Sequence, residues 1–272
     1  MVGKLFKHEI LAYMRLWLPT QAILFAIAVF MRILLFFENN GVVYSITFGS
    51  SVFLYVVAII AAIGITEVFA IVRFYKNLFT HEGYLTFTLP VSPFEHLFVK
   101  VGTAVLFTIM TLVAILLSGM IVASGELLIE IFKAIGFIVN QMFKALNGLH
   151  LTLYAFELTI FVIISLVGTF FYYYTCISIG QMAKKNRVLA AFGVYFGFYV
   201  ITQIISTIIT VIIAVFPDAF GVLLQDIEMF ADAHPYVFGH ILFISMNVIS
   251  AAFTALYFFV THLIIRKKLN LE

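Results

Sequence analysis

The sequence predicts an all-α integral membrane protein that crosses the bilayer six times. Of its 272 residues, 64% are hydrophobic and only 10% are charged, whereas a soluble domain is about half apolar and a quarter charged. Apolar runs long enough to cross a bilayer, which takes about 20 residues, recur along the chain, and clusters of lysine and arginine separate alternate runs. We therefore interpret residues 1–272 as a single transmembrane domain in a lipid bilayer.

Residues 1–15 precede the first apolar run and place basic and apolar side chains on different sides of a helix. Leu5 and Ile10 share one side, which is typical of an amphipathic helix lying in the membrane interface; a solvated tail is the alternative. The first span covers about residues 17–37, with Trp17 in the interfacial aromatic belt. Its length predicts an uncleaved span, because the apolar region of a signal peptide is only about 7–15 residues long.

The second span covers about residues 42–72, and the polar stretch 73–100 follows it. Near the end of that stretch, Ser92 and Glu95 form a capping-box pattern around a proline at the first helical position. This pattern predicts the start of a helix. The third span, about residues 97–122, continues from this start.

Apolar residues recur at helical spacing in residues 123–150, but charged and amide side chains interrupt them. The segment is either a seventh span or an amphipathic helix on the outer surface. A seventh span would move the basic turn at 183–187 and the basic C-terminus to the outer side. That arrangement contradicts the excess of Lys and Arg that cytoplasmic segments carry. We therefore expect an amphipathic extracellular helix.

Three further spans are expected at about residues 154–182, 188–216 and 237–265. A strongly basic turn joins the first two, whereas residues 217–236 form an acidic loop without Lys or Arg. Six spans with cytoplasmic N- and C-termini place twelve of the fifteen Lys and Arg residues on the cytoplasmic side. These twelve are Lys4, Lys7, Arg15, Arg73, Lys76, Lys100, Lys184, Lys185, Arg187, Arg266, Lys267 and Lys268. This positive-inside pattern predicts a multi-pass protein of the cell (plasma) membrane.

Motifs for catalysis, phosphate binding and metal binding are absent from the sequence. It holds no G-x-x-x-x-G-K-[ST] phosphate-binding loop, no H-E-x-x-H zinc motif and a single cysteine, Cys176. Its seven histidines are scattered, and a lone histidine at a membrane boundary is usually an interfacial polar group. We therefore expect this chain to be no enzyme by itself, to hold no cofactor or metal, and to bind no nucleic acid.

Three ionisable residues inside the predicted spans are candidate functional sites: Arg32, Glu67 and Glu157. Charged groups inside a bilayer are costly, so those that occur often have a function. Arg32 and Glu157 both lie toward the outer ends of their spans, and a structural ion pair between them is the alternative. None of the three lies at the middle of a span, which does not favour an ion-coupled transporter.

One part of the polar stretch resembles a known family. Asn77-Leu78-Phe79, followed by Glu82-Gly83-Tyr84-Leu85-Thr86-Phe87-Thr88-Leu89-Pro90-Val91, is similar to the loop after the second span of small ABC-2-type permeases. These are the membrane subunits of bacterial ABC exporters. Ile179-Gly180-Gln181 before the basic turn and the Lys-Lys-Leu-Asn-Leu sequence after the last span resemble the same group, as does the layout of six spans with a basic C-terminus.

The resemblance implies that the loop between spans two and three is a cytoplasmic coupling helix that docks on a separate ABC ATPase subunit. The residues implied to form this coupling region are Asn77, Phe79, Glu82, Gly83, Tyr84, Leu85, Phe87, Leu89 and Pro90. It also implies a second permease chain, identical or not, and MgATP bound by the partner subunit. The alternative is an ATP-independent membrane protein, either a secondary transporter or a membrane scaffold or sensor. The extracellular helix at 123–150 has no counterpart in the resembling motif.

Overall fold

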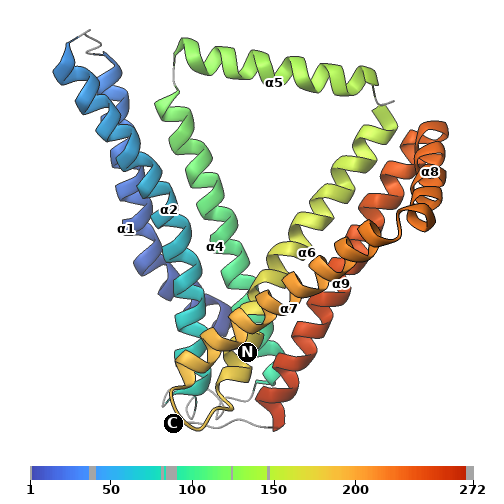
Figure 1. The fold of residues 1–272 in the computed structure, drawn as a ribbon. Coiled ribbons are helices and arrows are strands. Elements are labelled where there is room, and N and C mark those ends of the chain that lie inside the picture. Colours follow the sequence, from blue (N-terminus) through green and yellow to red (C-terminus); the bar gives the residue numbers. More distant parts are fainter. Residues whose placement is uncertain are drawn as a thin grey trace. The chain divides into compact units, whose positions relative to one another are not determined.

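The computed structural model describes residues 2–36, 41–80, 83, 91–123, 125–145 and 148–267, and almost all of them are helical (Figure 1). The helices of this described part are α1 (Val2–Phe36), α2 (Val42–Phe79), α4 (Pro93–Val122), α5 (Glu126–Ala145), α6 (Gly148–Gly180), α7 (Arg187–Val215), α8 (Pro217–Ala233) and α9 (Pro235–Lys267). Six of them, α1, α2, α4, α6, α7 and α9, are long and apolar enough to cross a membrane. The prediction of an all-α, multi-pass membrane protein with six candidate spans is thereby confirmed.

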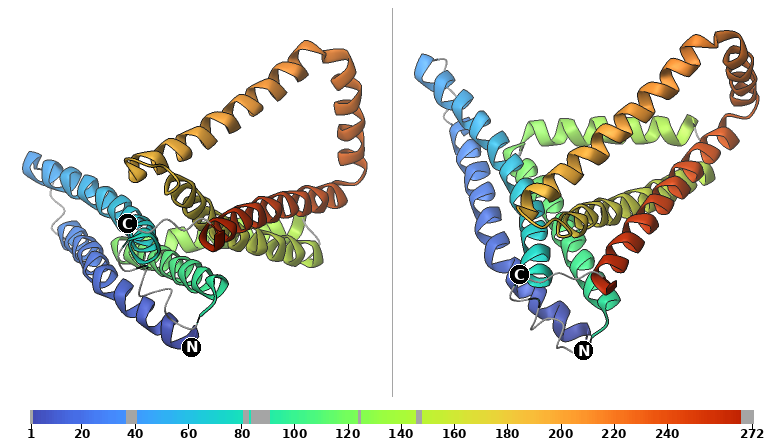
Figure 2. Two further views of the ribbon diagram at one scale, coloured as in Figure 1. Left: turned by 90° about the horizontal axis from the view of Figure 1, so that it is seen from below. Right: turned by 60° about the horizontal axis from the view of Figure 1, so that its bottom comes forward.

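The helices group into two compact units, Met1–Lys144 and Ala145–Glu272. In the first unit, α1, α2 and α4 pack against one another. In the second, α6 packs against both α7 and α9, and α8 packs against α9 and α7. Figure 2 shows α7 and α9 diverging, with α8 joining their far ends. Each unit therefore contains three of the six candidate spans and has its own core.

Helix α1 continues without interruption from Val2 to Phe36, so the structure does not show its first turns as a separate interfacial helix. The side chains of Glu9 and Tyr13 are buried, each with 2% of its surface exposed. They are buried because this part of α1 packs against α2 and α4. The basic residues near the N-terminus predicted a helix on the membrane surface. In the structure, packing against α2 and α4 keeps the first turns of α1 continuous with the first span.

The start of α4 follows the predicted capping box. The backbone N–H of Glu95 donates to the Ser92 hydroxyl at 3.3 Å, and the backbone N–H of Ser92 donates to the Glu95 carboxylate at 2.7 Å. Pro93 occupies the first helical position, where its missing N–H costs no hydrogen bond. The prediction of a helix start at this point is confirmed, and α4 runs from there to Val122 as a single helix.

Helix α5 lies in the segment where a helix was expected, and it is not among the helices apolar enough to cross a membrane. All of its described side chains from residue 129 to residue 144 are exposed. The next helix, α6, begins at Gly148, earlier than the predicted start near residue 154. The placement of α5 on the extracellular membrane surface stays a prediction.

The acidic segment at 217–236 is helical, so the prediction of a loop there was wrong. Helix α8 begins with Pro217 in its first turn, which suits a helix start because proline lacks only an N–H that has no helical partner there. Apolar and acidic residues alternate along α8 at helical spacing, and α8 packs against α9. The many acidic residues suggested a solvated loop, whereas the helical spacing of the apolar residues among them supports an amphipathic helix.

Candidate functional site

Three charged residues from three helices meet at one end of the first unit, and we call them the charge triad: Glu9 of α1, Arg73 of α2 and Lys100 of α4. The Glu9 carboxylate accepts a hydrogen bond from Lys100 Nζ at 2.5 Å and another from Arg73 Nε. Asn77 lies one turn after Arg73 on the same face of α2, and its Nδ2 is 3.4 Å from Glu9 Oε1. A single carboxylate therefore links the ends of α1, α2 and α4.

The charge triad is largely removed from solvent. Glu9 is 2% exposed and Lys100 is 4% exposed, whereas the side chain of Arg73 is 24% exposed. Burial of charges carries a large desolvation cost, which close ion pairing and hydrogen bonding offset. Loss of any one member of the triad should therefore cost much more stability than loss of one partner from an exposed surface pair.

An aromatic layer separates the charge triad from the apolar part of the unit. Tyr13, one turn after Glu9, packs edge-on against Phe69 of α2 at 4.9 Å between ring centroids, and it stacks on Phe107 of α4 at 4.8 Å. Trp17, one turn further along α1, packs edge-on against Phe107 at 5.7 Å. These rings cover the inner side of the triad with contacts from all three helices.

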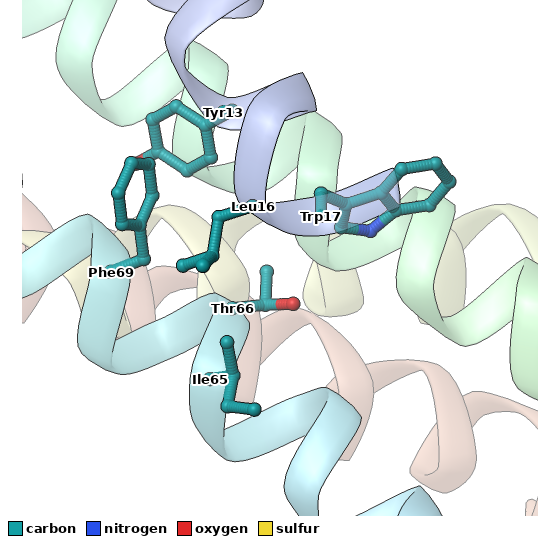
Figure 3. Close-up of a pocket in the computed structure, with 6 residues that line it drawn as sticks. All are labelled: Tyr13, Leu16, Trp17, Ile65, Thr66 and Phe69. Atoms are coloured by element: carbon teal, nitrogen blue, oxygen red, sulfur yellow. The ribbon is translucent and has the colours of Figure 1, made fainter. Parts of the chain in front are cut away.

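Beyond this layer, hydroxyl groups join the three helices. The indole N–H of Trp17 donates to Thr111 Oγ1 at 2.8 Å, and Thr66 Oγ1 lies 3.1 Å from Thr111 Oγ1. A cavity of about 10 Å³ lies beside this contact, enough for about one water molecule (Figure 3). Its lining residues are Tyr13, Leu16, Trp17, Ile65, Thr66 and Phe69. The cavity is too small for a molecule much larger than water.

The structure places three of the predicted coupling residues and leaves the others undescribed. Asn77 contacts the charge triad, and Phe79 is buried with its ring edge-on to Phe74 at 5.8 Å. Gly83 is buried, and its N–H donates to the Thr80 carbonyl at 2.8 Å. The remaining predicted residues lie outside the described residues: Glu82, Tyr84, Leu85, Phe87, Leu89 and Pro90.

Each of the three candidate intramembrane charges has different surroundings. Arg32 lies against Gly125, where an added Cβ would come within 3.1 Å of its guanidinium and where the backbone φ of +98° favours glycine. Glu67 is partly buried on α2. Glu157 belongs to the second unit, where its carboxylate contacts His240 Nδ1 at 2.8 Å. The partner of Glu157 within its own unit is thus a histidine.

The sequence did not single out Glu9, His150 or His240. Glu9 is the only acidic residue in the first 37 residues. A lone acidic residue among basic ones was the only sequence feature that could have marked it as a candidate. Its partners lie 64 and 91 residues further along the chain, so their convergence depends on the fold. The two histidines lie 90 residues apart, and no local pattern connects them.

Comparisons with protein-family models, curated proteins and solved structures gave no match for this chain. The fold and composition alone define its class, which is that of all-helical, multi-pass membrane proteins with six candidate spans.

Proposed function

We propose that this chain is the transmembrane subunit of an ABC transporter, an exporter in which a separate ATPase subunit binds and hydrolyses MgATP. Two permease chains, identical or not, would pair in the membrane and bind two ATPase subunits. On this proposal the chain contributes no catalytic residue. Its task is to convert movement of the bound ATPase into alternating access between the two membrane halves.

The observation that carries the proposal is the contact between Asn77 and the charge triad. Asn77 is the first residue of the stretch that resembles a coupling loop, and its side chain touches the carboxylate that links α1, α2 and α4. Phe79 and Gly83, two further residues of the stretch, are buried. A stretch anchored in this way would transmit a displacement to three spans at once, which is what coupling to an ATPase requires.

We expect Glu82→Ala and Gly83→Pro to weaken binding of the ATPase subunit at least tenfold, a change of about 1.4 kcal/mol. Glu82 offers a charge to the partner, and Gly83→Pro removes the N–H that donates to Thr80. The measurement is the amount of ATPase that co-purifies with the affinity-tagged permease after both subunits are produced together.

Glu130→Ala is the matched control, because Glu130 is an exposed glutamate on α5, away from the coupling stretch. It should leave the amount of co-purified ATPase unchanged. If both coupling variants retain wild-type binding of the ATPase while inserting normally, this loop is not the coupling element.

The cytoplasmic placement of the basic turns leads to a separate expectation. Asn186→Cys should resist an impermeant thiol reagent added to intact cells, whereas Asn140→Cys on α5 should react. Both positions are exposed in the structure, and the native Cys176 is buried, so reactivity reports the side of the membrane. Labelling of Cys introduced at 186 from outside would contradict the six-span topology.

A further inference from the structure

Three titratable side chains form a continuous hydrogen-bonded series between α6 and α9 in the second unit. Glu157 Oε1 lies 2.8 Å from His240 Nδ1, and His240 Nε2 lies 3.1 Å from His150 Nδ1. His150 and Glu157 are both on α6, about two turns apart, and His240 on α9 lies between them in the series. We call this series the histidine relay.

Aromatic rings hold both imidazoles in place. The Tyr154 ring stacks on His240 with 4.2 Å between ring centroids and an interplanar angle of 17°. The Tyr236 ring stacks on His150 at 4.5 Å and 5°. The Tyr154 hydroxyl also donates to the Tyr236 carbonyl at 2.9 Å, so each of the two helices fixes a ring that belongs to the other.

A glycine allows this arrangement. A Cβ added to Gly239 would lie 2.2 Å from the Tyr154 hydroxyl oxygen, which is far inside van der Waals contact. Tyr154 therefore reaches the Tyr236 carbonyl only because residue 239 has no side chain. The close approach brings His240, the next residue of α9, onto the Tyr154 ring.

The relay extends from the helix ends into the less accessible part of the unit. His150 is the third residue of α6, whereas the side chains of His240 and Glu157 are 17% and 15% exposed. The second carboxylate oxygen, Glu157 Oε2, is buried and has no hydrogen-bond partner among the described residues. These helix ends are opposite those that carry the basic turn and Arg266, so the positive-inside rule assigns them to the outer side.

We propose that the histidine relay is a proton-binding site that takes up one proton from the outer solution and holds the resulting charge beside Glu157. In the neutral state of the pair, His240 Nδ1–H donates to Glu157, and His150 Nδ1–H donates to His240 Nε2. A proton that binds to His150 Nε2 releases the Nδ1 proton of His150 to His240 Nε2. One proton enters, one moves across the 3.1 Å contact, and the positive charge arrives on His240, next to the carboxylate.

The surroundings of the relay contain a limited set of titratable groups. Among the described residues of α6 and α9, those in contact with the relay are Tyr154 and Tyr236, beside Glu157 and the two histidines themselves. Helix α8 also packs against α9, and three of its four acidic residues, Asp226, Glu228 and Asp232, are exposed. Within the described part of the chain, no ion pair joins these three to the relay. Glu157 is therefore the carboxylate that stabilises a charged His240.

The test is nitrogen NMR of the full chain, labelled with ¹⁵N-histidine and reconstituted in lipid nanodiscs. Near neutral pH we expect a scalar coupling between His150 Nδ1 and His240 Nε2, because an N–H···N bond transmits it. The coupling should vanish at acidic pH, once a second proton occupies the acceptor nitrogen. Failure to observe this coupling at any pH between about 5 and 8 would overturn the proposal, and this measurement requires no variant.

Glu157→Gln provides the second measurement. Removal of the carboxylate charge should shift the ¹⁵N resonance of His240 Nδ1, because the hydrogen bond from this nitrogen would then reach a neutral amide oxygen. Asp232→Asn is the matched control, because it removes an exposed carboxylate from α8 and should leave His240 unchanged. An unchanged His240 Nδ1 resonance in Glu157→Gln would also overturn the proposal. The site does not depend on coupling to an ATPase, so loss of ATPase binding in the permease would leave both measurements unaffected.

Discussion

Replacement of Glu9 with Gln is expected to destabilise the first helical unit by about 3–5 kcal/mol, the usual cost of removing one partner from a buried ion pair. The variant takes the shared carboxylate charge away from Arg73 and from Lys100, which is only 4% exposed. The measurement is unfolding in increasing SDS, followed by the fluorescence of Trp17. Trp17 is the only tryptophan in the chain and donates a hydrogen bond to Thr111 in the same unit, so it reports on this unit alone.

Two further variants separate the charge effect from a general loss of packing. Glu67→Gln changes a partly buried glutamate of the same unit and should alter the unfolding free energy by less than about 1 kcal/mol. The double variant Glu9→Gln/Lys100→Gln should recover part of the loss, because it removes a cation together with its partner. An unfolding curve for Glu9→Gln that overlays the wild-type curve would mean that the charge triad does not stabilise the unit.

Gly180→Ala is expected to separate α7 from α6. A Cβ at position 180 would lie 2.5 Å from both the backbone nitrogen and the Cα of Ala191. These are backbone atoms, so relief requires a shift of the helix itself, which costs about 1–3 kcal/mol in a packed structure. Cys176, one turn earlier on α6, is buried. Its reaction with a small thiol reagent in detergent should therefore accelerate at least fivefold, which corresponds to about 1 kcal/mol.

Gly193→Ala is the matched control for this change. Position 193 lies on α7, and an added Cβ there would meet no atom within 4 Å. The control should leave the reactivity of Cys176 at the wild-type rate. If Gly180→Ala and Gly193→Ala react equally fast, the close approach of α6 and α7 at Gly180 is not maintained in the membrane protein.

The features of the fold that could be predicted are those that depend on residues close together in the sequence. Apolar runs of sufficient length determine the six candidate spans. The capping box at Ser92 and Glu95 depends on residues three positions apart, so its local pattern was sufficient. Helix α8 was predicted as a loop because its segment is rich in acidic residues. The helical spacing of its apolar residues indicates a helix instead. The division into two compact units was not predicted, because it depends on which helices pack together.

The candidate sites were less accessible to prediction because they depend on contacts between distant residues. Glu9 lies among basic residues that indicated a membrane surface, yet its partners belong to two other helices. Glu157 was recognised as a candidate, but its partner His240 lies 83 residues away. In the predicted coupling stretch, Asn77, Phe79 and Gly83 are placed by the structure, while the role of the stretch rests on its resemblance to ABC-2-type permeases.

The position of the charge triad gives the first unit the mechanics of a lever. Glu9 fixes α1 near one end, and from Glu9 to Phe36 the helix continues for about 40 Å at about 1.5 Å per residue. A tilt of about 5° around that fixed point would displace the far end by roughly 3.5 Å over this length. Because the ionic contacts lie near the pivot, they would lengthen little during such a tilt. A small rotation at the charged end would thus be amplified into a larger displacement at the opposite end of α1.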